Sequence, residues 1–292
     1  ICQVNNKYVG KEIVGDVNVY DVNSMYPYQM CTKLLPYTVP EYFKGEYKTD
    51  INYPLYIQRI KVECELKPNK QPTILTENGL FGKTDFLIKT NYDFVELVLT
   101  NIDLELLKTH YKISEIEYID GYKFKGSTNL FKSFIEPIYE MKSKTKGAER
   151  QLYKILLNSL YGKFAMNPHR KNIVPYVDPI LDRVVYKRDD EKDEKPIYTA
   201  VASFITSYAR EKTIRTSQAI KTYSLEKYGK DYYIYSDTDS IHTLLSIEEL
   251  EKFCEIDSEK LGAWKHEDSF IKARYVRQKT YVEFIIEKED IK

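Results

Sequence analysis

Apolar and polar positions alternate with a strand-like period in several parts of the chain. Val17–Asp21 predicts a strand that ends at a carboxylate, and Tyr53–Glu65 predicts a second β-rich stretch. Asp231–Leu245 predicts a β-hairpin whose turn is Ser236–Asp239. Near the end, the alternation over Arg274–Ile286 predicts one further strand.

Helical periodicity is clearest in the middle of the chain. It predicts helices from Asn129 to about Met141, from about Ala148 to Ala165, and over 200–228. Gly147 marks a break between the first two helices. Phe94–Lys108 predicts a helix or a buried mixed segment that Thr100 and Asn101 interrupt, and Pro175–Pro196 is polar and expected to be irregular. These elements together predict an α+β fold with inserted loops.

The composition is that of an ordinary soluble globular protein, with 292 residues, 42% hydrophobic and 30% charged. No apolar run reaches the length of a membrane span, so we expect no membrane partner. The formal net charge is zero, with 44 basic and 44 acidic residues. Nucleic-acid binders are often basic overall, so a basic groove in this chain would have to be offset by acidic loops and an acidic metal site.

Cysteine and histidine spacing excludes several site classes. The four cysteines lie far apart and form no CxxC pair, which excludes a zinc ribbon and argues against a disulfide framework: Cys2, Cys31, Cys64 and Cys254. The four histidines have no metal-ligand spacing and are expected to be structural.

Two carboxylates, Asp237 and Asp239, stand one residue apart within Tyr235–Ser240, at the predicted hairpin turn. Such a turn offers hard oxygen ligands, which suit Mg²⁺ or Mn²⁺. In isolation this pattern is more often an ordinary aspartate-rich turn. An EF-hand loop is excluded because its sixth position, which requires glycine, is His242.

A third carboxylate, Asp21, ends a predicted strand within Tyr20–Pro27. Pro27 lacks an N–H donor, so strand pairing stops just beyond Asp21. A strand-end acid beside a hairpin-tip acid would hold two divalent ions about 3.5–4 Å apart, as in-line displacement at phosphorus requires. Asp21 has this meaning only together with Asp237 and Asp239.

The helix predicted around residue 155 has a polar stripe with one residue on each successive turn: Arg150, Lys154, Asn158 and Tyr161. Cations on such a face suit a triphosphate and an aromatic ring suits a base, whereas the structural alternative is a solvated face with Tyr161 half-buried. A second face carries leucines that are expected to anchor the helix in the core: Leu152, Leu156 and Leu160.

In order and in type, these stretches resemble the motifs of family B DNA polymerases. Asp21–Pro27 resembles motif A (DxxSLYP), Lys154–Gly162 motif B (KxxxNSxYG) and Tyr235–Ser240 motif C (YxDTDS). Lys279–Tyr281 is similar to the KxY motif. As part of one strand, Lys279 and Tyr281 would share a face with Tyr275 and Arg277, although Lys279 as a plain solvated strand lysine remains the alternative.

Longer stretches resemble the protein-primed branch of this family, which includes the replicative polymerases of small Bacillus phages with terminal proteins. These stretches are Leu99–Leu106, Tyr118–Tyr122, Asn158–Pro168 and Arg277–Tyr281. The resemblance implies an α+β right-hand polymerase core, with an antiparallel palm sheet, helical fingers, two inserted subdomains and a largely absent thumb.

The resemblance also implies a division of the chain. The expected parts are palm with motif A at 1–30, palm continuation and a first terminal-protein-region-like insertion at 31–125, fingers with motif B at 126–166, a second insertion at 167–197, and palm with motif C and KxY, running into the start of a thumb, at 198–292. The chain begins with Ile1, about twenty residues before motif A. We therefore expect this chain to be a segment of a longer protein. The segment itself is expected to lack the exonuclease domain, proofreading and high processivity.

By resemblance, Asp21, Asp237 and Asp239 form the catalytic group. Asp21 and Asp239 are expected to be the principal ligands of two Mg²⁺ ions, for which Mn²⁺ would substitute, with the Val22 carbonyl assisting and Asp237 sharing the site. The nucleotide-binding residues implied are Tyr26, Lys142, Arg150, Lys154, Asn158 and Tyr161. Tyr26 would exclude a 2′-hydroxyl and Lys154 would bind the triphosphate. The DNA-binding residues implied are Ser159, Gly162, Lys279 and Tyr281.

The function implied is a DNA-directed DNA polymerase, a nucleotidyltransferase that replicates a phage or plasmid in the cytoplasm of a bacterial host. Its partners would be primer-template DNA, dNTPs and a terminal-protein primer. The alternative of another class is a catalytically incompetent fragment that acts as a DNA or terminal-protein binding module. A reverse transcriptase is disfavoured because its motif is YxDD, and a polymerase that starts without any primer is a close relative that stays open.

Overall fold

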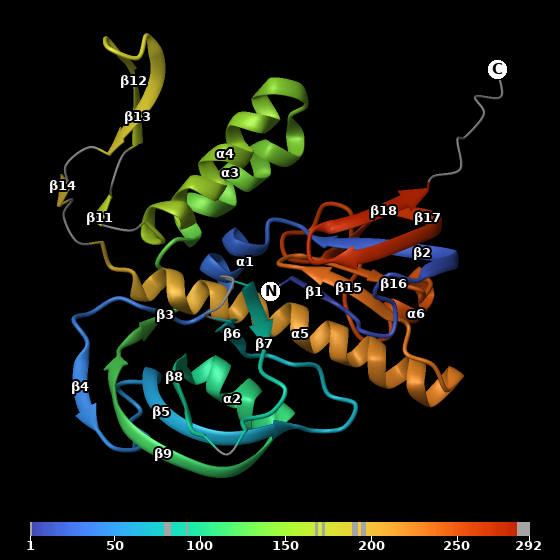
Figure 1. Cartoon of the computed structure of the whole chain (residues 1–292), viewed down its shortest axis with the longest axis horizontal. Helices are drawn as coiled ribbons and strands as arrows, with labels where there is room; N and C mark the ends of the chain where they lie inside the picture. The colour runs from blue at the N-terminus through green and yellow to red at the C-terminus, as the bar shows by residue number, and fades with distance from the viewer. Residues whose placement is uncertain are drawn as a thin grey trace.

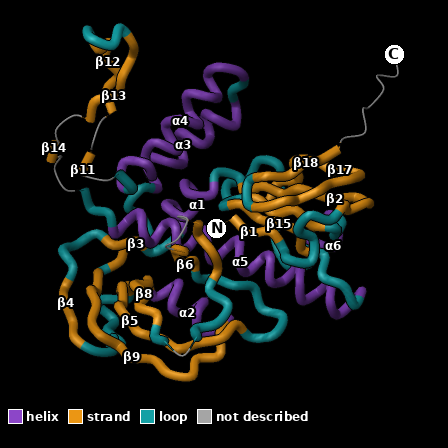
Figure 2. Tube along the Cα trace, viewed as in Figure 1, coloured by secondary structure: helices purple, strands orange, loops and turns teal. Residues whose placement is uncertain are grey.

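One long helix, α5 (Ala200–Tyr228), runs through the centre of the molecule between two antiparallel sheets (Figure 1). The computed structural model describes residues 2–78, 83–91, 93–166, 169–170, 173–188, 192–193 and 197–284. Figure 2 shows that the two sheets lie on different sides of α5. Among the described helices, none has the length and apolar character that crossing a membrane requires.

The larger sheet has six antiparallel strands in the order β1-β15-β16-β2-β17-β18. Their bounds are β1 (Cys2–Val4), β15 (Tyr233–Asp237), β16 (Ser240–Thr243), β2 (Glu12–Val22), β17 (Trp264–Arg277) and β18 (Thr280–Phe284). The buried side chains of Tyr20, Trp264 and Ile241 form a core with Ala209 and Ile220 of α5. The predicted strand up to Asp21 and the predicted hairpin after residue 231 are both confirmed.

The prediction of one strand over Arg274–Ile286 is wrong. Strand β17 ends at Arg277, Lys279 adopts a left-handed φ of 56°, and β18 returns antiparallel from Thr280. Lys279 therefore lies in a turn, and Tyr281 pairs across from Tyr275 instead of following it along one strand. An alternating pattern looks the same in one strand and in a hairpin, because both have a period of two. Ile286 lies outside the described residues.

The smaller sheet has the order β4-β9-β5-β8 and curves around helix α2. Its elements are β4 (Glu41–Lys44), β9 (Tyr111–Phe124), β5 (Leu55–Leu66), β8 (Val95–Thr100) and α2 (Asn101–His110). The stretch Phe94–Lys108 is thus a mixed segment. Its strand ends at Thr100 and its helix begins at Asn101, the two residues that were predicted to interrupt it. The Thr100 hydroxyl accepts a hydrogen bond from the Asp103 N–H and caps α2.

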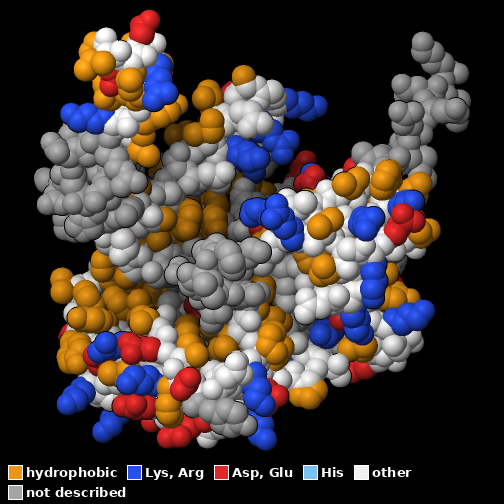
Figure 3. Space-filling view, in the orientation of Figure 1, with side chains coloured by type: hydrophobic (Ala, Val, Ile, Leu, Met, Phe, Trp, Pro, Cys, Tyr) orange, Lys and Arg blue, Asp and Glu red, His pale blue; other side chains and the backbone are white. Residues whose placement is uncertain are grey.

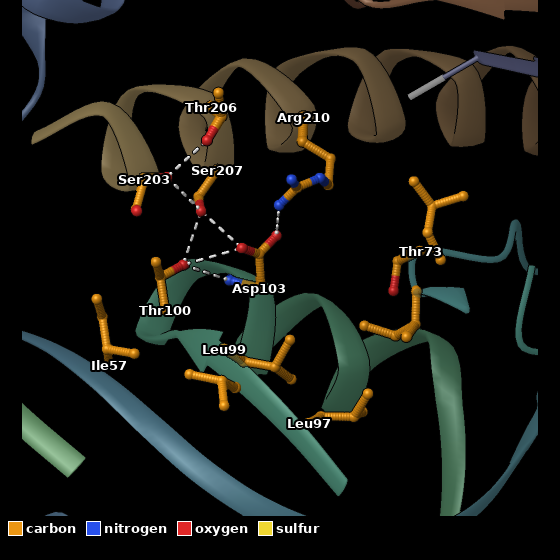
Figure 4. A pocket seen from close by; sticks show the side chains of 13 residues that line it. Ile57, Thr73, Leu97, Leu99, Thr100, Asp103, Ser203, Thr206, Ser207 and Arg210 are labelled. Carbon is orange, nitrogen blue, oxygen red and sulfur yellow. Dashed lines mark hydrogen bonds and ion pairs between the residues drawn. The ribbon is translucent and has the colours of Figure 1, made fainter. Parts of the chain in front are cut away.

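An ion pair fastens the smaller sheet to α5 (Figure 4). Asp103 of α2 is buried, and its Oδ1 accepts a hydrogen bond from Arg210 Nη1 of α5 at 2.5 Å. Its Oδ2 accepts from Ser207 Oγ at 2.6 Å and from Thr100 Oγ1 at 3.0 Å. These groups line a cavity of about 380 Å³ between the two helices. A buried carboxylate is stable here because both of its oxygens are hydrogen-bonded.

Helices α1 (Met25–Thr32), α3 (Lys132–Lys144) and α4 (Gly147–Phe164) lie above α5, and the short α6 (Ile247–Leu250) lies beside it. The predicted helices over 129–166 and 200–228 are confirmed in type, with shifts of a few residues at their ends. Helices α3 and α4 form an antiparallel pair that projects away from both sheets (Figure 1).

The expectation that Leu152, Leu156 and Leu160 anchor α4 in the core is wrong for the first two, which are 61% and 47% exposed. Only about the last two turns of α4 reach the core. Residues there that contact it follow helical spacing: Leu157, Leu160, Tyr161 and Phe164. The earlier turns project beyond the core, so an apolar position there has no core to pack against.

The other strands of the described residues form two-stranded pairs: β3 (Leu35–Pro36) with β10 (Gly126–Ser127), β6 (Leu75–Asn78) with β7 (Lys83–Phe86), β11 (His169–Arg170) with β14 (Lys192–Asp193), and β12 (Ile173–Asp178) with β13 (Arg183–Arg188). The β12–β13 hairpin contradicts the irregular structure expected over Pro175–Pro196, of which 189–191 and 194–196 lie outside the described residues. Asp178 Oδ1 accepts the N–H groups of Ile180 and Leu181 and so forms the turn. Both strands of the hairpin have exposed apolar residues, so the order of apolar and polar positions along them does not mark a buried face.

The Asp103–Arg210 pair should contribute measurably to folding. Asp103→Ala leaves Arg210 and Ser207 without their carboxylate, and we expect a loss of about 2–3 kcal/mol in the free energy of unfolding. Glu140→Ala is the matched control, because its i,i+4 pair with Lys144 is exposed on both sides and should contribute little. Urea unfolding of both variants measures the difference, and equal small losses would contradict the anchoring role.

Candidate active site

A cavity of about 640 Å³ opens where strands β2, β16 and β17 meet helices α1, α3 and α4. It contains most of the residues that the three sequence motifs singled out. Its lining includes Asp21, Val22, Ser24, Tyr26, Lys142, Arg150, Lys154, Asn158, Tyr161, Asp239, Lys265 and Glu267. The motifs are up to about 220 residues apart in the chain, so only the fold brings them to one place.

Antiparallel pairing of β2 with β16 brings Asp21 and Asp239 together. Asp21 lies directly opposite Ser240, and the N–H of Val22 donates to the carbonyl of Asp239 at 2.8 Å. Burial raises the pKa of Asp21 to about 7, with further increases from the charges of Asp239 and Glu267. Burial and the charge of Asp237 also raise the pKa of Asp239. A nearby positive charge would stabilise two carboxylates that are partly buried and close together.

Asp237 lies beside this pair but does not line the cavity. Its Oδ2 accepts from Lys279 Nζ at 2.9 Å and lies 3.5 Å from the Tyr235 hydroxyl. Within the described part of the chain, no three His, Cys, Asp or Glu side chains are close enough to hold a metal ion together. The carboxylates that line the cavity are Asp21, Asp239 and Glu267, and the metal-binding roles of Asp21, Asp237 and Asp239 stay predictions.

Cations face the carboxylates from the α3–α4 pair. Lys142, Arg150 and Lys154 all line the cavity, and Lys142 Nζ donates to Ser24 Oγ at 2.8 Å. Burial lowers the pKa of Lys142, and the neighbouring charges of Arg150 and Lys154 lower it further. Figure 3 shows Lys and Arg side chains on this helix pair and on the facing edge of the six-stranded sheet. Three cations that line one cavity favour a polyanionic ligand.

Two tyrosine rings form one wall of the cavity. Tyr26 of α1 and Tyr161 of α4 stack with ring centroids 4.1 Å apart. Burial raises the pKa of Tyr26 to about 12, and the positive charge of Arg210 opposes this shift. Tyr26 is therefore a neutral hydrogen-bond donor at physiological pH, and Asn158 lines the same cavity. The polar stripe that the sequence predicted on α4 faces the cavity as expected.

Two residues of β17, Lys265 and Glu267, line the cavity without having been predicted from the sequence. Lys265 pairs directly opposite Asp21, and its Nζ donates to Glu267 Oε1 at 2.8 Å. The charge of Glu267 raises the pKa of Asp21 and that of Lys265 lowers it. No spacing in the sequence signals these residues, because they reach the cavity only through the pairing of β2 with β17.

The remaining predicted residues lie outside the cavity. Ser159 and Gly162 lie on α4, and Lys279 and Tyr281 lie in the β17–β18 hairpin. Tyr281 is 39% exposed and contacts the rings of Tyr235 and Tyr275. The DNA-binding roles expected of these four residues stay predictions.

Comparison with known proteins assigns the family. Residues 1–256 match the family described as DNA polymerase type B, organellar and viral. The chain belongs to this family. It is 46% identical to the DNA polymerase of Bacillus phage Nf, 43% identical to that of Bacillus phage phi29 and 34% identical to that of Streptococcus phage Cp-1. These alignments cover 97–98% of the chain and 48–49% of the relatives, so the chain spans about half the length of these three phage polymerases.

Solved structures confirm the polymerase fold. The phi29 DNA polymerase in complex with primer-template DNA and incoming nucleotide substrates is 42% identical and superposes with a TM-score of 0.88. An orthorhombic crystal form of the same polymerase superposes with a TM-score of 0.85. In both cases 97% of the chain and 48% of the phi29 chain are covered. The predicted resemblance to family B polymerases of small Bacillus phages is thus confirmed.

The raised pKa of Asp21 predicts how stability responds to pH. The folded state binds a proton on Asp21 between about pH 4 and 7 that the unfolded state does not bind, so wild-type stability falls as pH rises through this window. Asp21→Asn removes this penalty, and without divalent cations we expect it to stabilise the chain at pH 8 by roughly 1–2 kcal/mol.

At pH 4 the same substitution should change stability little. Thermal unfolding at both pH values measures the two effects. Addition of Mg²⁺ at pH 8 should raise the unfolding temperature of the wild type more than that of Asp21→Asn. An equal Mg²⁺ response of the two chains would argue against a cation site at Asp21.

Proposed function

We propose that this chain is the polymerising core of a DNA-directed DNA polymerase, which adds dNTPs to a primer 3′-hydroxyl during replication of a phage or plasmid. The observation that carries the proposal is the cavity that joins Asp21 and Asp239 to the cations of α3 and α4. An acidic floor opposite a basic wall suits a metal-bound triphosphate. The phage origin of the relatives supports a location in the cytoplasm of a bacterial host.

The residues present fit divalent metal ions. Asp21 and Asp239 would hold two Mg²⁺ or Mn²⁺ ions together with the Val22 carbonyl, and Asp237 would share the site. When bound, the metals supply positive charge that acidifies the primer hydroxyl and neutralises the leaving pyrophosphate. The elevated pKa values of Asp21 and Asp239 favour this assignment, because bound cations would stabilise the charged carboxylates that burial and neighbouring negative charge disfavour.

The basic wall would bind the incoming nucleotide. Lys154, Arg150 and Lys142 would bind the triphosphate, and the distribution of charge over three side chains suits its several phosphates. Tyr26 would lie under the deoxyribose and leave no room for a 2′-hydroxyl. Tyr161 and Asn158 would line the nascent base pair. These residues bind and orient the substrate, so positioning and electrostatics supply most of the rate.

The primer-template duplex would contact residues outside the cavity. Lys279 and Tyr281 would hold the primer terminus, and Ser159 with Gly162 would face the template. The phi29 polymerase was solved with primer-template DNA bound, which supports this partner. A terminal-protein hydroxyl, which the resemblance of the sequence to the protein-primed branch implies, would be a second acceptor. In either case the attacking group is a hydroxyl, so the same carboxylates and cations serve the reaction.

The central test is primer extension by the full chain with Mg²⁺ or Mn²⁺, beside Asp239→Asn. Loss of one carboxylate ligand should reduce extension by about 100-fold or more. Asp268→Asn is the matched control, since this carboxylate is exposed on β17 and does not line the cavity. No extension by the wild type, with DNA still bound, would favour the alternative of a binding module.

Lys154→Ala tests the triphosphate wall. Removal of one cation should raise the KM for dNTP about tenfold while affinity for primer-template DNA stays within about twofold. Lys163→Ala provides the control, because Lys163 is exposed in the last turn of the same helix and lies outside the cavity. Steady-state kinetics with varied dNTP measures both variants. Similar effects of the two substitutions would contradict a specific role of Lys154.

A further inference from the structure

The β17–β18 hairpin is fastened to the rest of the palm sheet by a buried polar cluster that the proposed mechanism does not use. His242 of β16 is 3% exposed, Tyr275 of β17 is fully buried, and the Glu283 side chain of β18 is 13% exposed. His242 lies three residues beyond Asp239. The cluster therefore connects the strand that follows the acidic turn to both strands of the hairpin.

The hydrogen bonds within this cluster determine where its protons are. The Tyr275 hydroxyl donates to Glu283 Oε1 at 2.6 Å. His242 Nδ1 lies 2.7 Å from the Tyr275 oxygen and 2.9 Å from the same Glu283 oxygen. Because the one hydroxyl proton is directed to Glu283, Nδ1 must carry a proton to satisfy both contacts. His242 is thus a donor whose ring orientation is set by the end of β18.

The rings around His242 include a residue that the KxY motif singled out. Tyr281 lies 5.5 Å from His242, 5.2 Å from Tyr275 and 5.2 Å from Tyr235, measured between ring centroids. His242 also packs edge-on against Tyr235 at 4.9 Å. Tyr281 is therefore held on one side by this group of rings and is exposed on the other.

The same hairpin places its turn against the acidic turn. Lys279 Nζ contacts Asp237 Oδ2 at 2.9 Å, although the Lys279 side chain is 72% exposed. An exposed ion pair of this kind contributes little stability by itself. The position of Lys279 must therefore be determined by the hairpin that carries it, and the buried cluster is where that hairpin meets β16.

We propose that His242, through Glu283, is a positioning residue that holds Lys279 and Tyr281 in register with the catalytic carboxylates. This inference rests on the proposed polymerase function, in which these two residues hold the primer. Burying a polar pair costs desolvation, and apolar side chains would join the strands at least as strongly. Directional hydrogen bonds specify one pairing register of the strands, which apolar contacts do not. A slip of one residue in this register would turn Tyr281 to the other face of the sheet.

The experiment compares three variants of the full chain. His242→Phe keeps a ring but removes the donor, and Glu283→Gln keeps the shape but weakens the acceptor. His110→Phe is the matched control, because His110 is equally buried and hydrogen-bonded but lies in α2, far along the chain from the hairpin. Two readouts are used: hydrogen exchange of the amides in 276–284, and the KM values for primer-template DNA and for dNTP.

The expected result is at least tenfold faster exchange in the hairpin for His242→Phe and a smaller increase for Glu283→Gln. The KM for primer-template DNA should rise at least fivefold in His242→Phe, while the KM for dNTP changes less than twofold. His110→Phe should lower the unfolding temperature without either change. If His242→Phe does not fold, Glu283→Gln decides by the same criteria.

Two results would overturn the proposal. One is unchanged hairpin exchange in both cluster variants, and the other is a rise of both KM values in equal proportion, which would indicate general destabilisation. If the wild type does not extend a primer, the polymerase function fails, but hydrogen exchange still decides whether His242 positions the hairpin. The two hypotheses therefore fail separately.

Discussion

The site depends on one electrostatic constraint, which is that Asp21 and Asp239 are held close together in a partly buried place. Strand pairing between β2 and β16 enforces this proximity, and the raised pKa values of both carboxylates show its cost. Positively charged side chains lie around the two carboxylates. Lys265 is paired opposite Asp21, and the cations of α3 and α4 line the other side of the cavity. Opposite charges therefore face each other across one cavity, which offsets the repulsion within each cluster.

Helix α5 makes this arrangement possible, since both sheets and the helix pair pack against it. One of its faces supplies Ala209 and Ile220 to the core of the palm sheet. Another face offers Arg210 to Asp103, which fixes the smaller sheet. The charge of Arg210 also reaches Tyr26 in the cavity, so the anchor of the smaller sheet and the tyrosine wall are electrostatically connected. Disturbance of this helix would therefore affect both at once.

The β17–β18 hairpin at the end of the described chain is a peripheral element whose position depends on buried contacts. Lys279 and Tyr281 are partly exposed, and an exposed ion pair cannot hold a strand in place. The buried His242–Glu283–Tyr275 cluster supplies directional contacts at the base of the hairpin. Rigid support of this kind lets long side chains face a ligand without defining the fold themselves.

Much of the local structure follows from the sequence alone. The strand that ends at Asp21, the acidic hairpin, the long helix after residue 200 and the polar stripe on α4 all follow from short-range periodicity, which backbone geometry dictates. The family likewise follows from the motifs, because their residue types and order are specific to it. Local patterns did not distinguish the β17–β18 hairpin from a single strand, because both share one period.

Only the tertiary structure decided which residues meet. Lys265 and Glu267 enter the site through strand pairing, Asp237 turns toward Lys279 rather than into the cavity, and Leu152 is exposed because α4 extends beyond the core. Each outcome depends on contacts between residues far apart in the chain. The sequence alone determined the residue types and their local geometry, and the packing of distant segments determined the charge and the burial that each residue experiences.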